Sequence, residues 1–255
     1  MSAEKIKLER VYRIYEVGKG NTVVAVEDVS LSVAPEEFVC IVGPSGCGKS
    51  TLLYLIACLD RPTAGQILVE GQPVKAPNPR VGMVFQPDSV FPWLTVRNNI
   101  EFGPQLRGIS PQECKTIGEN YIRMIGLEGF EDTLPRQLSG GMKKRVDVGR
   151  AFANNPDILL MDEPFGALDA MTKERLQLEL MRIWDSERKT VLFVTHDLEE
   201  ALVLGSRIVV MGLSPNTIQT IIEVPFSRPR DLLLKTSTEF QQYRRQLWDL
   251  LHVSA

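Results

Sequence analysis

The chain has 255 residues, of which 44% are hydrophobic and 24% charged. These proportions are typical of a globular protein and exclude collagen-like, coiled-coil and disordered classes. The 29 basic and 32 acidic residues nearly balance, so no global positive field would attract nucleic acid. No charge-free apolar stretch reaches the roughly 18 residues of a membrane span, and the first residues lack an apolar export segment. We therefore expect a cytoplasmic protein.

Cysteine and histidine are too few and too scattered for a zinc site. The four cysteines form no C-x-x-C pair, and there are only two histidines, His196 and His252. Such a pattern predicts reduced thiols packed in the interior. We expect His252 to be a surface or packing residue.

Apolar patterning predicts an α/β protein. The first forty residues alternate apolar and polar, which indicates an antiparallel β-region. Continuous apolar runs indicate buried parallel strands, at Phe38–Val42, Val81–Phe85, Ile158–Asp162, Val191–Thr195 and Ile208–Met211. Helical periods and start signals indicate helices, at Lys49–Leu59, from Pro111 toward Gly126, from Gly140 toward Asn154, at Ala170–Glu187 and at Asp231–Leu251.

These elements predict one domain, 1–255, built from three parts. Residues 1–87 and 156–212 would form an α/β core that carries an antiparallel β subdomain. Residues 88–155, where helical periods replace the α/β pattern, would form a helical insertion subdomain. Residues 213–255 would form a short C-terminal extension.

The strongest local signal is a phosphate-binding loop between a predicted strand and a predicted helix. It fits the pattern G-x-x-x-x-G-K-[ST] and consists of Gly43, Pro44, Ser45, Gly46, Cys47, Gly48, Lys49, Ser50 and Thr51. Glycines let the backbone amides curl around phosphate oxygens, Lys49 would reach the β and γ phosphates, and Ser50 would ligate Mg²⁺. A plain glycine-rich turn is the weaker alternative. The sequence therefore predicts a P-loop NTPase (RecA-like) fold that binds a nucleoside triphosphate.

Two adjacent carboxylates end the predicted strand Ile158–Asp162. Ligands bind at such strand ends in open α/β sheets. Asp162 would hold Mg²⁺ directly or through water, and Glu163 would take the proton from an attacking water. A solvated acidic strand end is a common alternative for one carboxylate, but not for two beside a P-loop.

Further motifs make the chain resemble ABC-type ATPase domains, and the resemblance extends from the start of the chain to Met211. Gln86 closes a strand as a Q-loop, Leu138–Met142 opens a helix as a signature, and Ala167–Asp169 stands as a D-loop. This resemblance implies the family's ATP site, in which Gln86 contacts Mg²⁺ and the attacking water. His196 would contact the γ-phosphate. The resemblance also implies a head-to-tail dimer. In that dimer, the nucleotide site would include four further residues, namely Ser139, Gly140, Gly141 and Asp169.

An aromatic residue near the N-terminus would stack on adenine. Tyr15 stands where the family usually places this aromatic, and Tyr12 is a rival within reach in sequence. Each could instead be an ordinary strand aromatic.

Several segments resemble the ATPases of nitrate, sulfonate, taurine and related anion importers. They include Phe91–Val96, Met161–Asp169, Phe193–Ala201 and the tail from Glu223. Phe91 and Trp93 would receive a helix of a membrane subunit, or would pack under the helical subdomain. The chain departs from the family pattern after the signature, at Lys144, Asp147 and Gly149, which puts the dimer's strength in doubt.

The resemblance implies an ATPase subunit that uses ATP and Mg²⁺ to power uptake of a small anionic solute through a separate permease. Its partners would be a second copy or a related ATPase subunit, the permease and, indirectly, a solute-binding protein. The chain would lie on the inner face of the cell membrane. The alternative is a soluble ABC ATPase that acts as a nucleotide-gated assembly factor with cytosolic partners.

Overall fold

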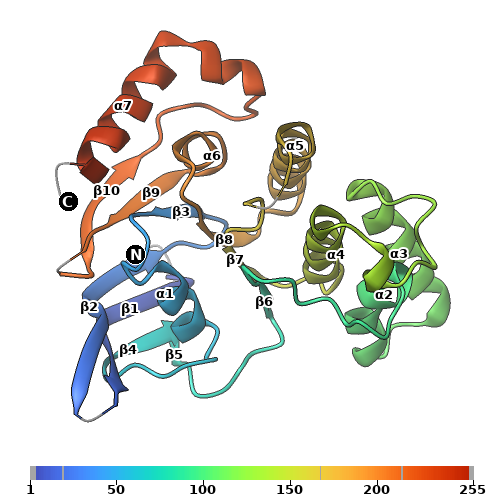
Figure 1. The fold of residues 1–255 in the computed structure, drawn as a ribbon, viewed down its shortest axis with the longest axis horizontal. Helices are drawn as coiled ribbons and strands as arrows, with labels where there is room; N and C mark the ends of the chain where they lie inside the picture. The colour runs from blue at the N-terminus through green and yellow to red at the C-terminus, as the bar shows by residue number, and fades with distance from the viewer. Residues whose placement is uncertain (1–3, 19, 167, 214, 253–255) are drawn as a thin grey trace. The chain divides into compact units, whose positions relative to one another are not determined.

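The computed structural model describes residues 4–18, 20–166, 168–213 and 215–252. The chain divides into two compact units (Figure 1): unit 1 comprises Met1–Asn78 and Met181–Ala255, and unit 2 comprises Pro79–Leu180. The subdomain boundaries expected from the sequence stay a prediction. Among the described residues, no helix combines the length and apolar character needed to cross a membrane.

Unit 1 contains an antiparallel sheet. Its strands are β1 (Ile6–Val17), β2 (Asn21–Val33), β4 (Ala64–Val69) and β5 (Gln72–Pro73), in the spatial order β2-β1-β4-β5. Alternate residues of the long strands are buried, as at Ile6 and Leu8 or Val29, Leu31 and Val33. This period of two confirms the antiparallel β-region predicted for the first forty residues.

A second set of strands in unit 1 is parallel at its centre. β3 (Phe38–Val42) pairs in parallel with β8 (Thr190–Val194) and with β9 (Arg207–Met211). Every residue of β3 and of β8 is buried, which explains their unbroken apolar sequences. β3 leads into α1 (Lys49–Ile56), and β8 leads into α6 (Leu198–Leu204). Neither α6 nor β10 (Ile218–Glu223), which pairs antiparallel with β9, was predicted from the sequence.

The tail differs from its prediction. A single helix over Asp231–Leu251 is wrong, because a 3-10 turn, η2 (Leu232–Thr236), precedes α7 (Thr238–His252). Ser237 separates them with an extended backbone, and its hydroxyl accepts the N–H of Phe240 at 3.2 Å. A serine whose side chain satisfies the first amides of a helix starts a new helix there.

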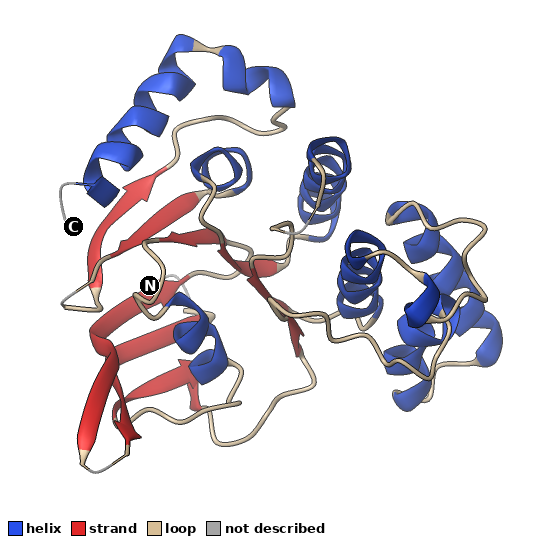
Figure 2. Cartoon of the chain, viewed as in Figure 1, coloured by secondary structure: helices blue, strands red, loops and turns tan. Residues whose placement is uncertain are grey.

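Unit 2 combines two parallel strands with packed helices (Figure 2). β6 (Val81–Val84) pairs with β7 (Ile158–Asp162). The helical elements are α2 (Val96–Leu106), α3 (Pro111–Met124), η1 (Pro135–Gln137) and α4 (Gly140–Ala153). The helices share a core that includes Ile100, Ile122 and Val146. Thr95, Ser110 and Ser139 cap the N-termini of α2, α3 and α4 with their hydroxyls, so the predicted helix starts at Pro111 and Gly140 are confirmed.

α5 (Ala170–Glu187) matches its predicted range. All four cysteines lie within the described residues and are free thiols; Cys40, Cys47 and Cys114 are buried, as the sequence predicts.

Candidate functional site

The predicted P-loop connects β3 to α1 in unit 1. Lys49 is only 7% exposed, and its ammonium donates to the carbonyl oxygens of Gly43 and Pro44, at 2.8 Å each. The N-terminus of α1 has no side-chain cap among the described residues and no acidic residue in its first turn. Uncapped amides beside a buried ammonium form a positive end that suits a phosphate group. Ser50 and Thr51 lie in the first turn of the same helix.

Close backbone approach explains two glycines of this loop. Gly48 has a φ of +93°, and a Cβ there would lie 2.1 Å from the carbonyl oxygen of Ala25 in β2. A Cβ on Gly43 would lie 2.6 Å from the carbonyl oxygen of Met211. Gly46 also has a positive φ, of +84°, but a Cβ there would meet nothing within 4 Å. Only glycine therefore fits at Gly43 and Gly48 without displacing a neighbouring strand.

His196 lies at the same sheet edge as the P-loop. The parallel register pairs Ile41 with Val194, so β3 and β8 end together before the P-loop and before His196. His196 is exposed, and the residues on either side of it are fixed. The Thr195 hydroxyl donates to Glu200 and accepts the N–H of Asp197 at 3.0 Å. The carboxyl ends of adjacent parallel strands thus bring His196 and the phosphate-binding loop together within unit 1.

Tyr15 is held in place by Arg13 and Asp60. Its hydroxyl donates to Asp60 Oδ2 at 2.6 Å, and the Arg13 guanidinium lies over its ring, 4.3 Å from the centroid. Tyr15 pairs with Val23 of β2, the strand that passes beside Gly48, whereas Tyr12 pairs with Ala64 on the other side of β1. The hydrogen bond to Asp60 and the contact with Arg13 therefore fix the orientation of the Tyr15 ring.

In unit 2 the Q-loop and the two carboxylates meet at one edge. β6 and β7 run in parallel, with Val84 opposite Met161, so the residues that follow both strands are neighbours. The amide nitrogen of Gln86 donates to Glu163 Oε2 at 3.3 Å. Asp162 is completely buried, and Glu163 has a left-handed backbone with φ +44°. Such conformations cost about 1–3 kcal/mol in a residue other than glycine and concentrate at functional sites.

The signature residues form an open helix start. Ser139 is the N-cap of α4, where its hydroxyl accepts the N–H of Met142 at 3.3 Å. Ser139 and Gly140 are exposed, and a Cβ on Gly140 would meet nothing within 4 Å. Leu138 is buried and anchors the preceding turn. This arrangement leaves the amide end of α4 accessible to an anion.

The D-loop is described only in part. Asp169 is exposed and accepts the N–H of Thr172 at 3.0 Å. Hydrogen bonds from the backbone and then the side chain of Thr172 hold the pKa of Asp169 below its usual value. Ala167 and the side chain of His252 lie outside the described residues.

The apolar segment after the Q-loop is partly packed and partly exposed. Phe91 packs against Phe102, with ring centroids 4.8 Å apart, and Trp93 stacks on Phe91 at 5.5 Å while remaining 71% exposed. The buried Asn99 of α2 fixes the segment by accepting the N–H of Phe91 and by donating to the carbonyls of Phe91, Leu94 and Thr95. Both predicted roles of the segment, packing and presentation, thus have a side chain that fits them.

The proposed metal ligands fit magnesium by their chemistry. Mg²⁺ prefers hard oxygen donors such as carboxylates and hydroxyls. Asp162 offers a carboxylate and Ser50 a hydroxyl, and Gln86 uses its amide nitrogen toward Glu163, which leaves its amide oxygen as an acceptor. Ser50 belongs to unit 1, whereas Asp162 and Gln86 belong to unit 2.

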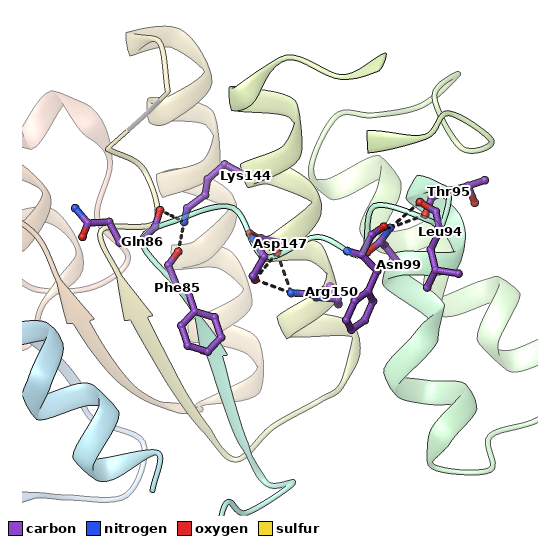
Figure 3. A network of polar contacts seen from close by, with 10 residues as sticks. Phe85, Gln86, Leu94, Thr95, Asn99, Lys144, Asp147 and Arg150 are labelled. Atoms are coloured by element: carbon purple, nitrogen blue, oxygen red, sulfur yellow. Dashed lines mark hydrogen bonds and ion pairs between the residues drawn. The ribbon is translucent and has the colours of Figure 1, made fainter. Parts of the chain in front are cut away.

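Asn99 was not among the predicted site residues, and Lys144 and Asp147 were predicted only as departures from a family pattern. All three are buried polar residues that bind the segment between Phe85 and Thr95 (Figure 3). A polar residue on the apolar side of a helical pattern was the available signal.

Comparisons with known proteins identify relatives of this chain. The family model described as ABC transporter matches residues 26–166. An uncharacterised ABC transporter ATP-binding protein of Methanocaldococcus jannaschii is 48% identical over 97% of this chain and 91% of its own length. The nitrate import ATP-binding protein NrtD of Synechocystis is 45% identical over 98% of this chain and 95% of its own length. The aliphatic sulfonates import ATP-binding protein SsuB of Bacillus thuringiensis is 42% identical over 89% of this chain and 88% of its own length.

A solved structure shows the same fold. It is a dimeric, post-hydrolysis state of an ATP-binding cassette with bound ADP and phosphate. Its TM-score is 0.79 at 34% sequence identity, and the match covers 87% of this chain and all of that one. The predicted P-loop NTPase fold is confirmed by this likeness.

Proposed function

The chain belongs to the ABC transporter family as an ATP-binding subunit that hydrolyses ATP, and from this premise we propose that it powers the import of a small anionic solute. The observation that carries the proposal is the 45% identity with a nitrate import ATP-binding protein over 98% of this chain. A relative named for aliphatic sulfonate import is nearly as similar. These relatives favour an importer over a soluble assembly factor.

The residue roles follow from the two groups of side chains. In unit 1, Lys49 and the amides of the P-loop bind the phosphates, His196 contacts the γ-phosphate, and Tyr15 stacks on adenine. The Arg13 guanidinium covers one face of the Tyr15 ring. The amide end of α1 and the buried ammonium support the phosphate role.

In unit 2, Glu163 is the general base and Gln86 orients the attacking water. The hydrogen bond between them supports this pairing. Asp162, Ser50 and Gln86 would hold Mg²⁺, which neutralises charge on the transferred phosphoryl group when it is bound. Replacement of a general base typically costs about 100 to 10,000-fold in turnover, so Glu163→Gln should slow ATP hydrolysis by that factor.

The signature and D-loop residues serve the partner site of a dimer. Ser139, Gly140 and Gly141 would bind the γ-phosphate held by a second copy or by a related subunit, with Asp169 beside them. The exposed amide end of α4 and the dimeric form of the solved relative support this assignment. The chain acts on the inner face of the cell membrane, where it joins a permease, and the permease in turn receives the solute from a solute-binding protein.

The test is co-purification of the tagged full-length chain from native membranes, followed by ATPase assays with and without the recovered partners. Recovery of a multi-span membrane protein that stimulates ATP hydrolysis supports the importer. Recovery of soluble partners alone contradicts it, and the ligand of any co-purified binding protein identifies the solute.

A further inference from the structure

Lys144 places a buried positive charge under the Q-loop. It lies in α4 and is 2% exposed. Its ammonium donates to the carbonyl oxygens of Phe85 and Gln86, the latter at 3.0 Å (Figure 3). Both acceptors are backbone atoms, and one belongs to the residue whose amide contacts Glu163. The ammonium therefore fixes the peptide units from which the Gln86 side chain projects.

The carboxylates around Lys144 include those of Asp162 and Glu163, at the end of β7. Burial lowers the pKa of the Lys144 ammonium. Four carboxylates oppose this effect by electrostatic attraction, those of Asp147, Asp88, Asp162 and Glu163. A buried charge is costly unless it is paired and hydrogen-bonded, and here the partners are the Q-loop backbone and the acidic strand end.

A second contact one turn further along α4 holds the same segment. Asp147 is 2% exposed and accepts the backbone N–H and the hydroxyl of Ser89, each at 2.8 Å. Arg150 donates to the Ser89 hydroxyl at 2.7 Å and to Asp147 at 2.9 Å. Residues three apart share a helix face, so Lys144, Asp147 and Arg150 present one charged stripe to the segment that begins at Phe85.

We propose that Lys144 is a positioning residue for Gln86: by holding the carbonyls of Phe85 and Gln86, it sets the direction in which the Gln86 amide reaches Glu163. The proposal rests on the function assigned above to Gln86 and Glu163. Because the P-loop and Tyr15 supply the binding contacts for ATP, a loss of Lys144 affects the chemical step and leaves ATP affinity in place. Misplacement of a catalytic group by about 1 Å can cost about 100-fold in rate.

The first test compares steady-state ATP hydrolysis by full-length Lys144→Met, Lys144→Gln and wild type. Met removes all donors at similar length, and we expect kcat to fall about 10 to 100-fold while KM for ATP stays within about twofold. Gln keeps an amide donor for the carbonyls and should restore most of kcat. Lys115→Met, at an exposed lysine of α3, is the matched control and should behave as wild type.

The second test asks whether Lys144 acts through Gln86. In a double-mutant cycle, Lys144→Met should cost little in kcat when Gln86→Ala has already removed the amide. An equal cost in both backgrounds overturns the proposal, as does an unchanged kcat in Lys144→Met or a parallel rise in KM that Lys144→Gln does not correct. If Lys144→Met does not fold, Lys144→Ala, which admits water to the carbonyls, takes its place with the same expectations.

Glu163→Gln distinguishes a failure of the proposed catalytic function from a failure of the positioning role of Lys144. If Glu163→Gln hydrolyses ATP as fast as wild type, the proposed catalytic function fails. If Glu163→Gln is slow and Lys144→Met is as fast as wild type, the catalytic function stands and only the positioning role of Lys144 fails.

Discussion

The backbone N–H and the hydroxyl of Ser89 both donate to the carboxylate of Asp147, at 2.8 Å each. Asp147 also accepts from Arg150, whose guanidinium lies 4.7 Å from the centroid of the Phe91 ring. Burial raises the pKa of Asp147, and the contacts from Ser89 and Arg150 act against that rise. The buried carboxylate of Asp147 thus links α4 to the segment after the Q-loop.

Asp147→Ala should lower the free energy of unfolding by about 3 kcal/mol, because it leaves the partly buried Arg150 charge without its carboxylate. Asp147→Asn keeps an acceptor for Ser89 and should cost less. Urea unfolding of the full-length variants measures both. Asp132→Ala removes an exposed carboxylate of the same unit and should stay within about 0.5 kcal/mol of wild type; an Asp147→Ala variant as stable as Asp132→Ala would contradict the buried-pair argument.

Gly48→Ala should be much more damaging than Gly46→Ala in the nucleotide-free protein. Both glycines have positive φ values, so each alanine carries a backbone cost of about 1–2 kcal/mol. Only at Gly48 does the new Cβ also collide with the carbonyl oxygen of Ala25, so we expect a total loss of about 3 kcal/mol or more. Thermal unfolding of the two variants without nucleotide gives the comparison, and equal losses would show that β2 gives way at Gly48.

The ionised Asp60 carboxylate should stabilise the protein near neutral pH and lose this effect in acid. Partial burial disfavours its charge, but hydrogen bonds from Tyr15, the Arg61 N–H and Arg13 outweigh burial and lower its pKa below 3.8. Because the folded-state pKa is the lower one, this stabilisation is present above pH 3.8 and is lost as the pH falls through the lowered pKa. Asp60→Asn should therefore be less stable than wild type near neutrality, and the difference should shrink with acidification.

Urea unfolding between pH about 6 and about 2 measures this convergence. Tyr15→Phe removes the largest of the contacts that lower the Asp60 pKa, so its stability should lie between those of wild type and Asp60→Asn near neutrality. A stability difference between wild type and Asp60→Asn that is constant over this pH range would contradict the pKa shift.

The elements that the sequence predicted best are those with one dominant cause. β3 and β7 match their predicted ranges because all their residues are buried, so their apolar runs are unbroken. β10 alternates between intermediate and exposed residues in a six-residue strand beside β9, and such a weak pattern does not separate it from a loop. The break at Ser237 depends on a local cap that helical periodicity does not reveal.

The candidate site also has parts that the sequence predicts and parts that it does not. The phosphate-binding loop and the two carboxylates after β7 could be predicted, because each is a motif of residues close together in the sequence. The contacts of Lys144 and Asn99 join residues of α4 and α2 to a loop that precedes both helices, so they depend on tertiary packing. A lysine in a helix is usually solvated, and its burial against two carbonyls is visible only in the folded unit.

Alanine variants of Trp93 and Phe91 should show which of these side chains serves docking to a permease and which serves packing of the helical part. Phe91→Ala removes a ring that contacts Phe102 and lies under Arg150, so it should lower the free energy of unfolding by about 2–3 kcal/mol. Trp93 is 71% exposed, and Trp93→Ala should change stability by no more than about 0.5 kcal/mol.

If Trp93 is an anchor for the permease, Trp93→Ala should still weaken recovery of the membrane partner and lower its stimulation of ATP hydrolysis, because aromatic anchors carry much of the energy of an interface. Pull-down from native membranes with wild-type and variant chains at matched amounts measures this effect. Met171→Ala, at another exposed apolar side chain of unit 2, is the control for general loss of apolar surface. Equal recovery with Trp93→Ala and wild type would assign Trp93 to neither role and leave Phe91 and its neighbours as a packing cluster alone.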